Sequence, residues 1–217
     1  MRNDLTELVF IIDRSGSMHG LEKDTIGGFN SVLAQNKALP GDANVTTILF
    51  DHDITLLHDR LPIQAIAPIT EDDYRVRGST ALLDAIGAGI DKIAAVQRHT
   101  AEAFRAGKVQ FVIITDGMEN ASRRYRLSQI REMITHQQQE YGWDFLFLGA
   151  NMDAISTAAD MGIHADRAVT AMSDKEGTGL QYQAIAQANM AYRAGHAPTA
   201  AWKQAVEADT AKRGKRW

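Results

Sequence analysis

The chain carries three nearly continuous apolar runs, at residues 6–12 (TELVFII), 109–114 (VQFVII) and 143–148 (WDFLFL). They are rich in β-branched and aromatic residues, and a polar turn or a glycine follows each of them. Such a run is typical of a strand that is buried on both faces of a parallel sheet, whereas a half-exposed strand alternates. We therefore predict three central strands at these positions.

Shorter strands and helices are expected between and beyond these runs. The stretches 45–50 and 54–58 are separated only by 51–53 (DHD), a spacing that predicts an antiparallel hairpin, and a short strand is expected at 167–170. Helical patterns fill the gaps: one carries Ile26, Phe29 and Leu33 on a single face, one is opened by Thr80, and others lie near 127–138, 153–161 and 179–194.

Strands that alternate with helices of these lengths indicate an α/β fold, with a mainly parallel sheet between two helical layers. We predict one domain over residues 1–172 and a C-terminal helical extension, 173–217, packed on or beside it. The last helix of this extension is expected to start at Pro198 and to end near Gly214.

Composition narrows the function classes. Of the 217 residues, 45% are hydrophobic and 23% are charged, as in ordinary globular domains, and the absence of cysteine excludes disulfides and thiolate chemistry. No apolar run approaches the roughly 18 residues of a membrane span, and the first seven residues lack the layout of a secretory signal. We therefore expect a cytoplasmic protein with no membrane partner.

The charge distribution points away from nucleic acid. A net charge of −4 argues against a basic binding surface spread over the chain, and the acidic excess lies in the first half, up to Asp116. Four basic residues near the end are interpreted as a solubilising tail: Lys212, Arg213, Lys215 and Arg216.

The residues that follow the buried strands carry the candidate chemistry, because ligands of open α/β sheets bind at the carboxyl ends of strands. The set contains two carboxylates and three hydroxyls: Asp13, Ser15 and Ser17 after the first strand, Asp116 after the fourth strand, and Thr80 in the loop that leads into the second long helix. Oxygen donors suit a hard divalent cation such as Mg²⁺, Mn²⁺ or Ca²⁺ better than zinc or copper. Two carboxylates and neutral hydroxyls also leave such an ion able to attract an external carboxylate.

Three segments, 13–18 (DRSGSM), 78–82 (GSTAL) and 115–117 (TDG), resemble the parts of the metal-ion-dependent adhesion site (MIDAS) of von Willebrand factor type A (vWA) domains. The resemblance covers roughly residues 5–170 and is strongest to small stand-alone bacterial or phage members. It implies a Rossmann-like three-layer α/β/α fold whose six-stranded sheet has the order 3-2-1-4-5-6, with strand 3 antiparallel. One departure is Ser79, where many members have glycine.

The resemblance also implies a role for the site. The five oxygen ligands would hold the ion, some through water, and an Asp or Glu of a protein partner would complete its coordination. We expect a protein-binding module without catalytic turnover, with Mg²⁺ as the preferred ion. Its partner-binding rim is expected at Arg14, Met18, His19, Tyr74, Arg75, Arg77, Met118, Glu119 and Asn120.

Two other functions fit the same residues. One is a Mg²⁺-dependent phosphohydrolase or phosphoryl-transfer enzyme with Asp13 at its strand end, although Ser15 replaces the second carboxylate of the usual D-x-D pattern. The other is a structural subunit whose site is vestigial. The pairs His52-Asp53 and His58-Asp59 are interpreted as loop polarity, and the scattered histidines lack H-E-x-x-H zinc spacing.

Overall fold

A computed structural model describes residues 1–214. Its centre is a six-stranded sheet of order β3-β2-β1-β4-β5-β6, in which only the β2–β3 pair is antiparallel. This arrangement confirms the predicted fold class and strand order. The strands are β1 (Arg2–Asp13), β2 (Asp42–Phe50), β3 (Ile54–Pro62), β4 (Ala106–Thr115), β5 (Asp144–Ala150) and β6 (Ala168–Ala171).

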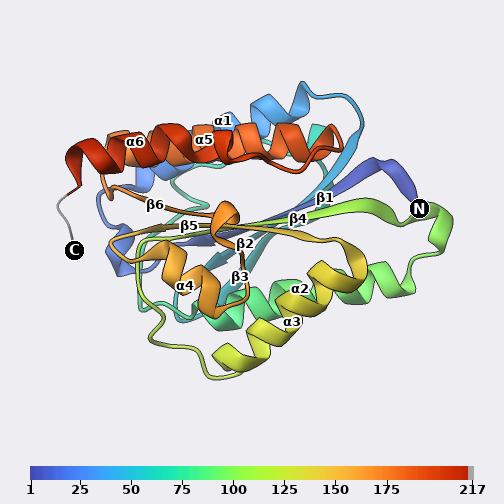
Figure 1. Ribbon diagram of the computed structural model, residues 1–217, viewed down its shortest axis with the longest axis horizontal. Helices are drawn as coiled ribbons and strands as arrows, with labels where there is room; N and C mark the ends of the chain where they lie inside the picture. Colours follow the sequence, from blue (N-terminus) through green and yellow to red (C-terminus); the bar gives the residue numbers. More distant parts are fainter. Residues whose placement is uncertain (215–217) are drawn as a thin grey trace.

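Helices cover both faces of the sheet (Figure 1). One layer contains α1 (Glu22–Lys37), α5 (Lys175–Arg193) and α6 (Gln204–Arg213), and the other contains α2 (Leu82–His99), α3 (Leu127–Tyr141) and α4 (Ala154–Asp160). Short 3-10 turns are η1 (Gly16–Met18), η2 (Ile63–Ala65), η3 (Glu102–Phe104), η4 (Ala165–Arg167) and η5 (Ala200–Lys203). Within residues 1–214, no helix has the length and apolar character needed to cross a membrane.

The C-terminal segment differs in detail from the prediction. The expected helix from Pro198 begins instead as η5 and continues as α6, so the proline lies two residues before the first turn. The expected basic tail falls partly outside the described residues, since Lys215, Arg216 and Trp217 lie beyond residue 214. Arg213, the part of it that is described, pairs with Asp209 on its own helix and with Asp174 before α5.

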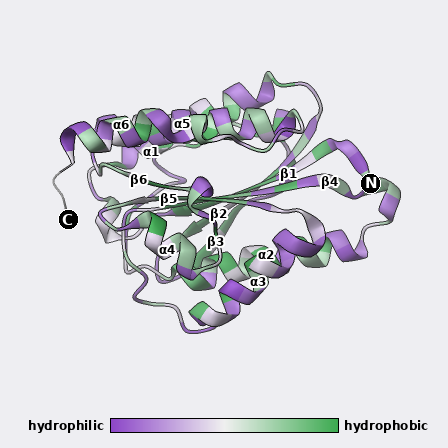
Figure 2. Ribbon diagram, in the orientation of Figure 1, coloured by the Kyte–Doolittle hydropathy of each residue, from purple (hydrophilic) through white to green (hydrophobic). Residues whose placement is uncertain are grey.

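The core explains why the central runs are almost purely apolar. Successive side chains of a strand point to opposite faces. In β1, Leu8, Phe10 and Ile12 therefore join the cluster under α1 and α5, whereas Val9 and Ile11 join the cluster under α2 and α3. Figure 2 shows hydrophobic residues along the central strands and mixed residues on the flanking helices.

Sheet topology places distant loops at one edge. Strands β1, β2 and β4 are parallel neighbours, with Asp13 beside Phe50 and Ile12 beside Ile114. The loops that follow these three strands therefore emerge together. This edge carries the residues that the sequence marks as candidate ligands.

Candidate metal centre

The first part of the site is the turn after β1. The backbone N–H of Ser15 donates to Asp13 Oδ1 at 2.6 Å, which folds the chain back over the end of the strand. The 3-10 turn η1 then brings the Ser17 hydroxyl to 3.0 Å from the Ser15 hydroxyl. Three predicted ligands, Asp13, Ser15 and Ser17, are therefore held together by a segment of five residues.

Thr80 reaches the same point from the loop before α2. Its hydroxyl donates to Ser15 Oγ at 3.0 Å across 65 residues of sequence. Asn120 fixes this loop, because its Oδ1 accepts from the Thr80 N–H at 2.9 Å and its own N–H donates to the Thr80 carbonyl at 3.0 Å. The loop that carries Asn120 thus holds the Thr80 backbone at two points and so positions the threonine hydroxyl.

Asp116, which follows β4, is the fifth predicted ligand. Its Oδ2 accepts from Ser173 at 3.4 Å, whereas its buried Oδ1 has no hydrogen-bond partner among residues 1–214. The next residue, Gly117, passes close to the hydroxyls: a Cβ there would lie 2.9 Å from Ser17 Oγ and 3.0 Å from Thr80 Oγ1. The structure therefore brings all five predicted residues together. Only glycine fits at position 117, because a side chain there would collide with the Ser17 and Thr80 hydroxyls.

The two carboxylates of this cluster, Asp13 and Asp116, both have raised pKa values. Burial raises the pKa of the Asp13 carboxyl, hydrogen bonds from Thr115 and Ser15 offset part of this effect, and the nearby Asp116 charge adds to it. Burial likewise raises the pKa of Asp116, and the hydroxyls of Ser17 and Ser173 offset part of this effect. A buried carboxylate without a cation is costly. The donor set, the raised pKa values and the unpartnered Asp116 oxygen fit a hard divalent cation.

Supporting residues that the sequence reading missed surround the ligands. The Thr115 hydroxyl donates to Asp13 Oδ2 at 2.6 Å, and its place directly before Asp116 was a signal that could have identified it. Behind Asp116, a cavity of about 10 Å³ is lined by Thr25, Gln181 and Tyr182. Each of these has a buried polar atom without a partner in the described chain, and the space suits one water molecule.

Five residues of the predicted rim hold the loops, and of these Asn120 is also exposed. Arg14 and Tyr74 are buried, with the guanidinium on Asp51 and the phenol donating to the Asp13 carbonyl at 2.5 Å. Met18 is buried, Glu119 accepts from the N–H groups of Leu83, Ala121 and Ser122, and Asn120 holds Thr80 as described above.

The other four rim residues hold no ligand loop by a buried side chain and reach solvent. Met118 is 72% exposed, and His19 and Arg75 are also exposed. Arg77 lies between the two groups, because its Nε donates to Asp51 while its side chain is half exposed. Around the candidate centre, the accessible surface therefore contains His19, Arg75, Arg77, Met118 and Asn120, together with the exposed Ser17.

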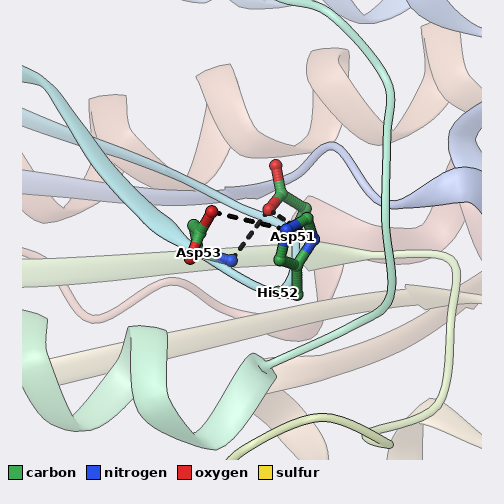
Figure 3. Close-up of side chains that lie close together, drawn as sticks. All are labelled: Asp51, His52 and Asp53. Carbon is green, nitrogen blue, oxygen red and sulfur yellow. Dashed lines mark hydrogen bonds and ion pairs between the residues drawn. The ribbon is translucent and has the colours of Figure 1, made fainter.

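A second acidic group lies beside this centre, at the β2–β3 turn (Figure 3). One ligand atom from each of Asp51, His52 and Asp53 lies within 4.8 Å of the others. The Asp51 carboxylate, however, already accepts from Arg14 at 2.8 Å, from Arg77 at 2.9 Å and from the Asp53 N–H at 2.8 Å. Two guanidinium charges at this carboxylate disfavour a further cation.

The role of this second group is to join loops. Burial alone would raise the pKa of Asp51, but the Asp53 N–H, the Arg77 hydrogen bond and the Arg14 charge outweigh it, and the pKa is lowered. The Asp51 carbonyl accepts from the Ala81 N–H at 2.8 Å, beside Thr80. Gly78 has a φ of 68°, and a Cβ there would lie 2.0 Å from His52 Nδ1. The Asp51 group therefore braces the loop that carries Thr80.

Comparison with solved structures identifies the fold. A vWA domain from Catenulispora acidiphila matches with a TM-score of 0.60 and 15% identity, over 86% of this chain and 43% of that one. The vWF domain of the pili tip protein Mfa5 from Porphyromonas gingivalis matches with a TM-score of 0.56 and 12% identity, over 84% and 94%. Proximal thread matrix protein 1 of the mussel byssus, solved with a zinc-occupied MIDAS motif, matches with a TM-score of 0.56 and 13% identity, over 83% and 44%.

These likenesses show that the chain has the fold of a vWA domain, as the sequence resemblance implied. The chain spans less than half the length of the Catenulispora and byssus proteins. No protein-family model and no curated protein sequence matches it.

Proposed function

We propose that the chain is a metal-dependent protein-binding module. Asp13, Ser15, Ser17, Thr80 and Asp116 would hold one divalent cation, preferably Mg²⁺, which is bound by oxygen ligands and commonly retains water. When bound, the cation would neutralise the two carboxylates and leave a position for an external acidic ligand. An Asp or Glu side chain of a protein partner is the ligand that we expect there.

One observation carries this proposal. Three hydroxyls lie within hydrogen-bond distance in series, Ser17 to Ser15 to Thr80, beside two buried carboxylates that have no cationic side chain of their own among residues 1–214. The solvent side, at Ser17 and Met118, is exposed and leaves room for a partner. The zinc-occupied MIDAS of the byssus protein supports metal binding by this fold.

The geometry favours binding over catalysis. Both oxygens of Asp13 accept hydrogen bonds, from the Ser15 N–H and the Thr115 hydroxyl, which ties the carboxylate that a phosphoryl-transfer mechanism would use as its nucleophile. Ser15 is bonded to Ser17 and Thr80 and to no histidine within the described chain. We therefore propose that the module has no turnover of its own.

Metal titration of Asp116→Asn tests the proposal. Calorimetry and thermal unfolding with Mg²⁺ and Mn²⁺ should show binding to the wild type, with about 2.7 kcal/mol of stabilisation at a metal concentration 100 times Kd, and none to the variant. In chelator the variant should be more stable than the wild type by about 1 kcal/mol, because a buried unpaired charge is removed. Asp160→Asn, at an exposed position on α4, is the matched control.

Partner binding and turnover are then measured separately. Immobilised wild type should capture a lysate protein in Mg²⁺ and release it in chelator, and Asp116→Asn should capture none. Capture that ignores both chelator and the substitution contradicts the proposal. Hydrolysis of p-nitrophenyl phosphate that needs Mg²⁺ and Asp116 would instead establish the phosphohydrolase.

A further inference from the structure

A second hollow lies at the other end of the sheet, where β4 and β5 begin and where α2 and α3 end. It has a volume of about 630 Å³, within the range of small-molecule sites, and we call it the pole pocket. Its lining includes Ala94, Arg98, Arg105, Gln137, Tyr141 and Trp143. None of these residues belongs to the candidate metal centre, so the pole pocket has to be explained separately.

Gln137 is the polar side chain that distinguishes the pole pocket. The residue is only 7% exposed, and its buried Oε1 has no hydrogen-bond partner among residues 1–214. An unpaired buried amide oxygen costs about 1–3 kcal/mol. Because the terminal torsion of glutamine is broad and roughly two-fold, rotation of the carboxamide can turn either amide atom towards the pocket. A ligand with both a donor and an acceptor on one edge would satisfy this carboxamide.

Positive charge lies on one side of the pole pocket. Arg98, at the end of α2, and Arg105, before β4, both line it, and neither guanidinium has a carboxylate within ion-pair distance in the described part of the chain. Arg105 Nε donates to the Thr100 carbonyl at 2.7 Å and Nη2 donates to the Arg98 carbonyl at 3.4 Å, which leaves the remaining N–H groups of the guanidinium for a ligand. Glu140 and His136 also line the pocket, on α3. The two arginines favour an anionic group on the ligand.

Aromatic surface completes the pole pocket. Trp143 is only 6% exposed and stacks on Phe111 with ring centroids 5.6 Å apart, so its ring is fixed by the core and offers a small surface to the pocket. Tyr141 is 65% exposed, and its ring forms a T-shaped pair with the His136 ring, with centroids 5.6 Å apart. A rigid indole and an exposed phenol beside a buried carboxamide suit a planar ring.

We propose that the pole pocket binds a small planar heterocycle that carries a lactam edge and an anionic substituent. The lactam N–H and C=O pair with the Gln137 carboxamide, the ring lies against Trp143 and Tyr141, and the anion meets Arg98 and Arg105. The anion is a carboxylate or a phosphate, since both accept from guanidinium in the same geometry.

The experiment uses the full chain and two probes, orotate for a carboxylate and uridine 5′-monophosphate for a phosphate, with uracil as the neutral comparison. Ligand-observed NMR and calorimetry should show binding of at least one anionic probe, about tenfold or more tighter than uracil, because charge-assisted hydrogen bonds are lost without the anion. Binding of orotate would identify the anion as a carboxylate, and binding of uridine 5′-monophosphate would identify it as a phosphate.

Variants locate the binding. Gln137→Leu replaces the glutamine with an apolar side chain of similar volume. Arg98→Gln changes an exposed side chain, so we expect it to leave the fold intact. Each substitution should weaken binding of the probe, raising its Kd by about tenfold. Gln139→Ala, at an exposed position on the same helix, and Asp116→Asn should leave the affinity unchanged. The proposal is overturned if neither probe binds, if uracil binds equally well, or if Arg98→Gln and Gln137→Leu both bind like wild type.

Discussion

Two kinds of buried carboxylate lie at the carboxyl edge of the sheet, Asp51 in one environment and the pair Asp13 and Asp116 in another, and their electrostatics are opposite. Asp51 is surrounded by Arg14, Arg77 and a backbone N–H, and its pKa is lowered. Asp13 and Asp116 are surrounded by hydroxyls and backbone, and their pKa values are raised. The contrast lies in the partners, since all three carboxylates are buried.

This difference separates a structural carboxylate from the carboxylates that we propose bind a cation. The protein supplies the counter-charge of Asp51 itself, so that this aspartate can brace the loops permanently. Asp13 and Asp116 lack such a counter-charge among residues 1–214, and an external cation would supply it. A cluster of acidic ligand atoms is therefore insufficient evidence for a metal site, because Asp51, His52 and Asp53 also lie close together.

The largest effect should come from Asp51→Asn. The substitution leaves the Arg14 guanidinium, whose side chain is only 9% exposed, without its anion, and should lower the free energy of unfolding by about 3 kcal/mol. Denaturant unfolding in chelator measures this change. The same substitution at Asp116 should have the opposite sign, and equal destabilisation by the two variants would remove the distinction between the groups.

A smaller effect is expected from Gly117→Ala, which acts on metal binding. The new methyl group would lie 2.9 Å from Ser17 Oγ and 3.0 Å from Thr80 Oγ1, and should weaken Mg²⁺ or Mn²⁺ binding about tenfold by displacing the hydroxyls. Calorimetry measures the affinity. Gly179→Ala is the matched control, because a Cβ there meets nothing within 4 Å. Unchanged affinity in Gly117→Ala would argue against a ligand role for the hydroxyls.

The smallest effect should come from acid below about pH 4. Because the folded-state pKa of Asp51 lies below its unfolded value of about 4, the stabilisation it provides is complete above that pH and is lost as pH falls through the folded pKa. The stability difference between wild type and Asp51→Asn should therefore shrink only below about pH 4. Unfolding curves between pH 6 and pH 2.5 test this, and a difference that is constant over the series would contradict it.

The sequence allowed much of the fold to be predicted. The apolar runs identified β1, β4 and β5, because strands buried on both faces leave little room for polar residues. The hairpin followed from the three-residue gap between β2 and β3. The start of the last helix was mispredicted, because a proline permits a first helical turn without requiring one.

The candidate ligands were also visible in the sequence, whereas their surroundings were not. Residues after strand ends share an edge in any parallel sheet, so Asp13, Ser15, Ser17 and Asp116 could be grouped from local patterns and order alone. Thr80, which lies before α2, was grouped with them through its place at the start of that helix and the resemblance of residues 78–82 to a MIDAS segment. Ser173 could not be grouped with them, since it reaches Asp116 across 57 residues and belongs to no motif.

Local pattern thus determined which strands are central and which oxygen donors share an edge, because both follow from strand periodicity and from the direction of a parallel sheet. Tertiary structure alone decided the direction and charge balance of long side chains. Arg14 and Tyr74 looked like rim residues, yet Asp51, 37 residues from Arg14, draws the guanidinium inward, and the phenol is buried on the Asp13 carbonyl. Such orientations depend on partners that are distant in sequence, and only the folded chain brings those partners together.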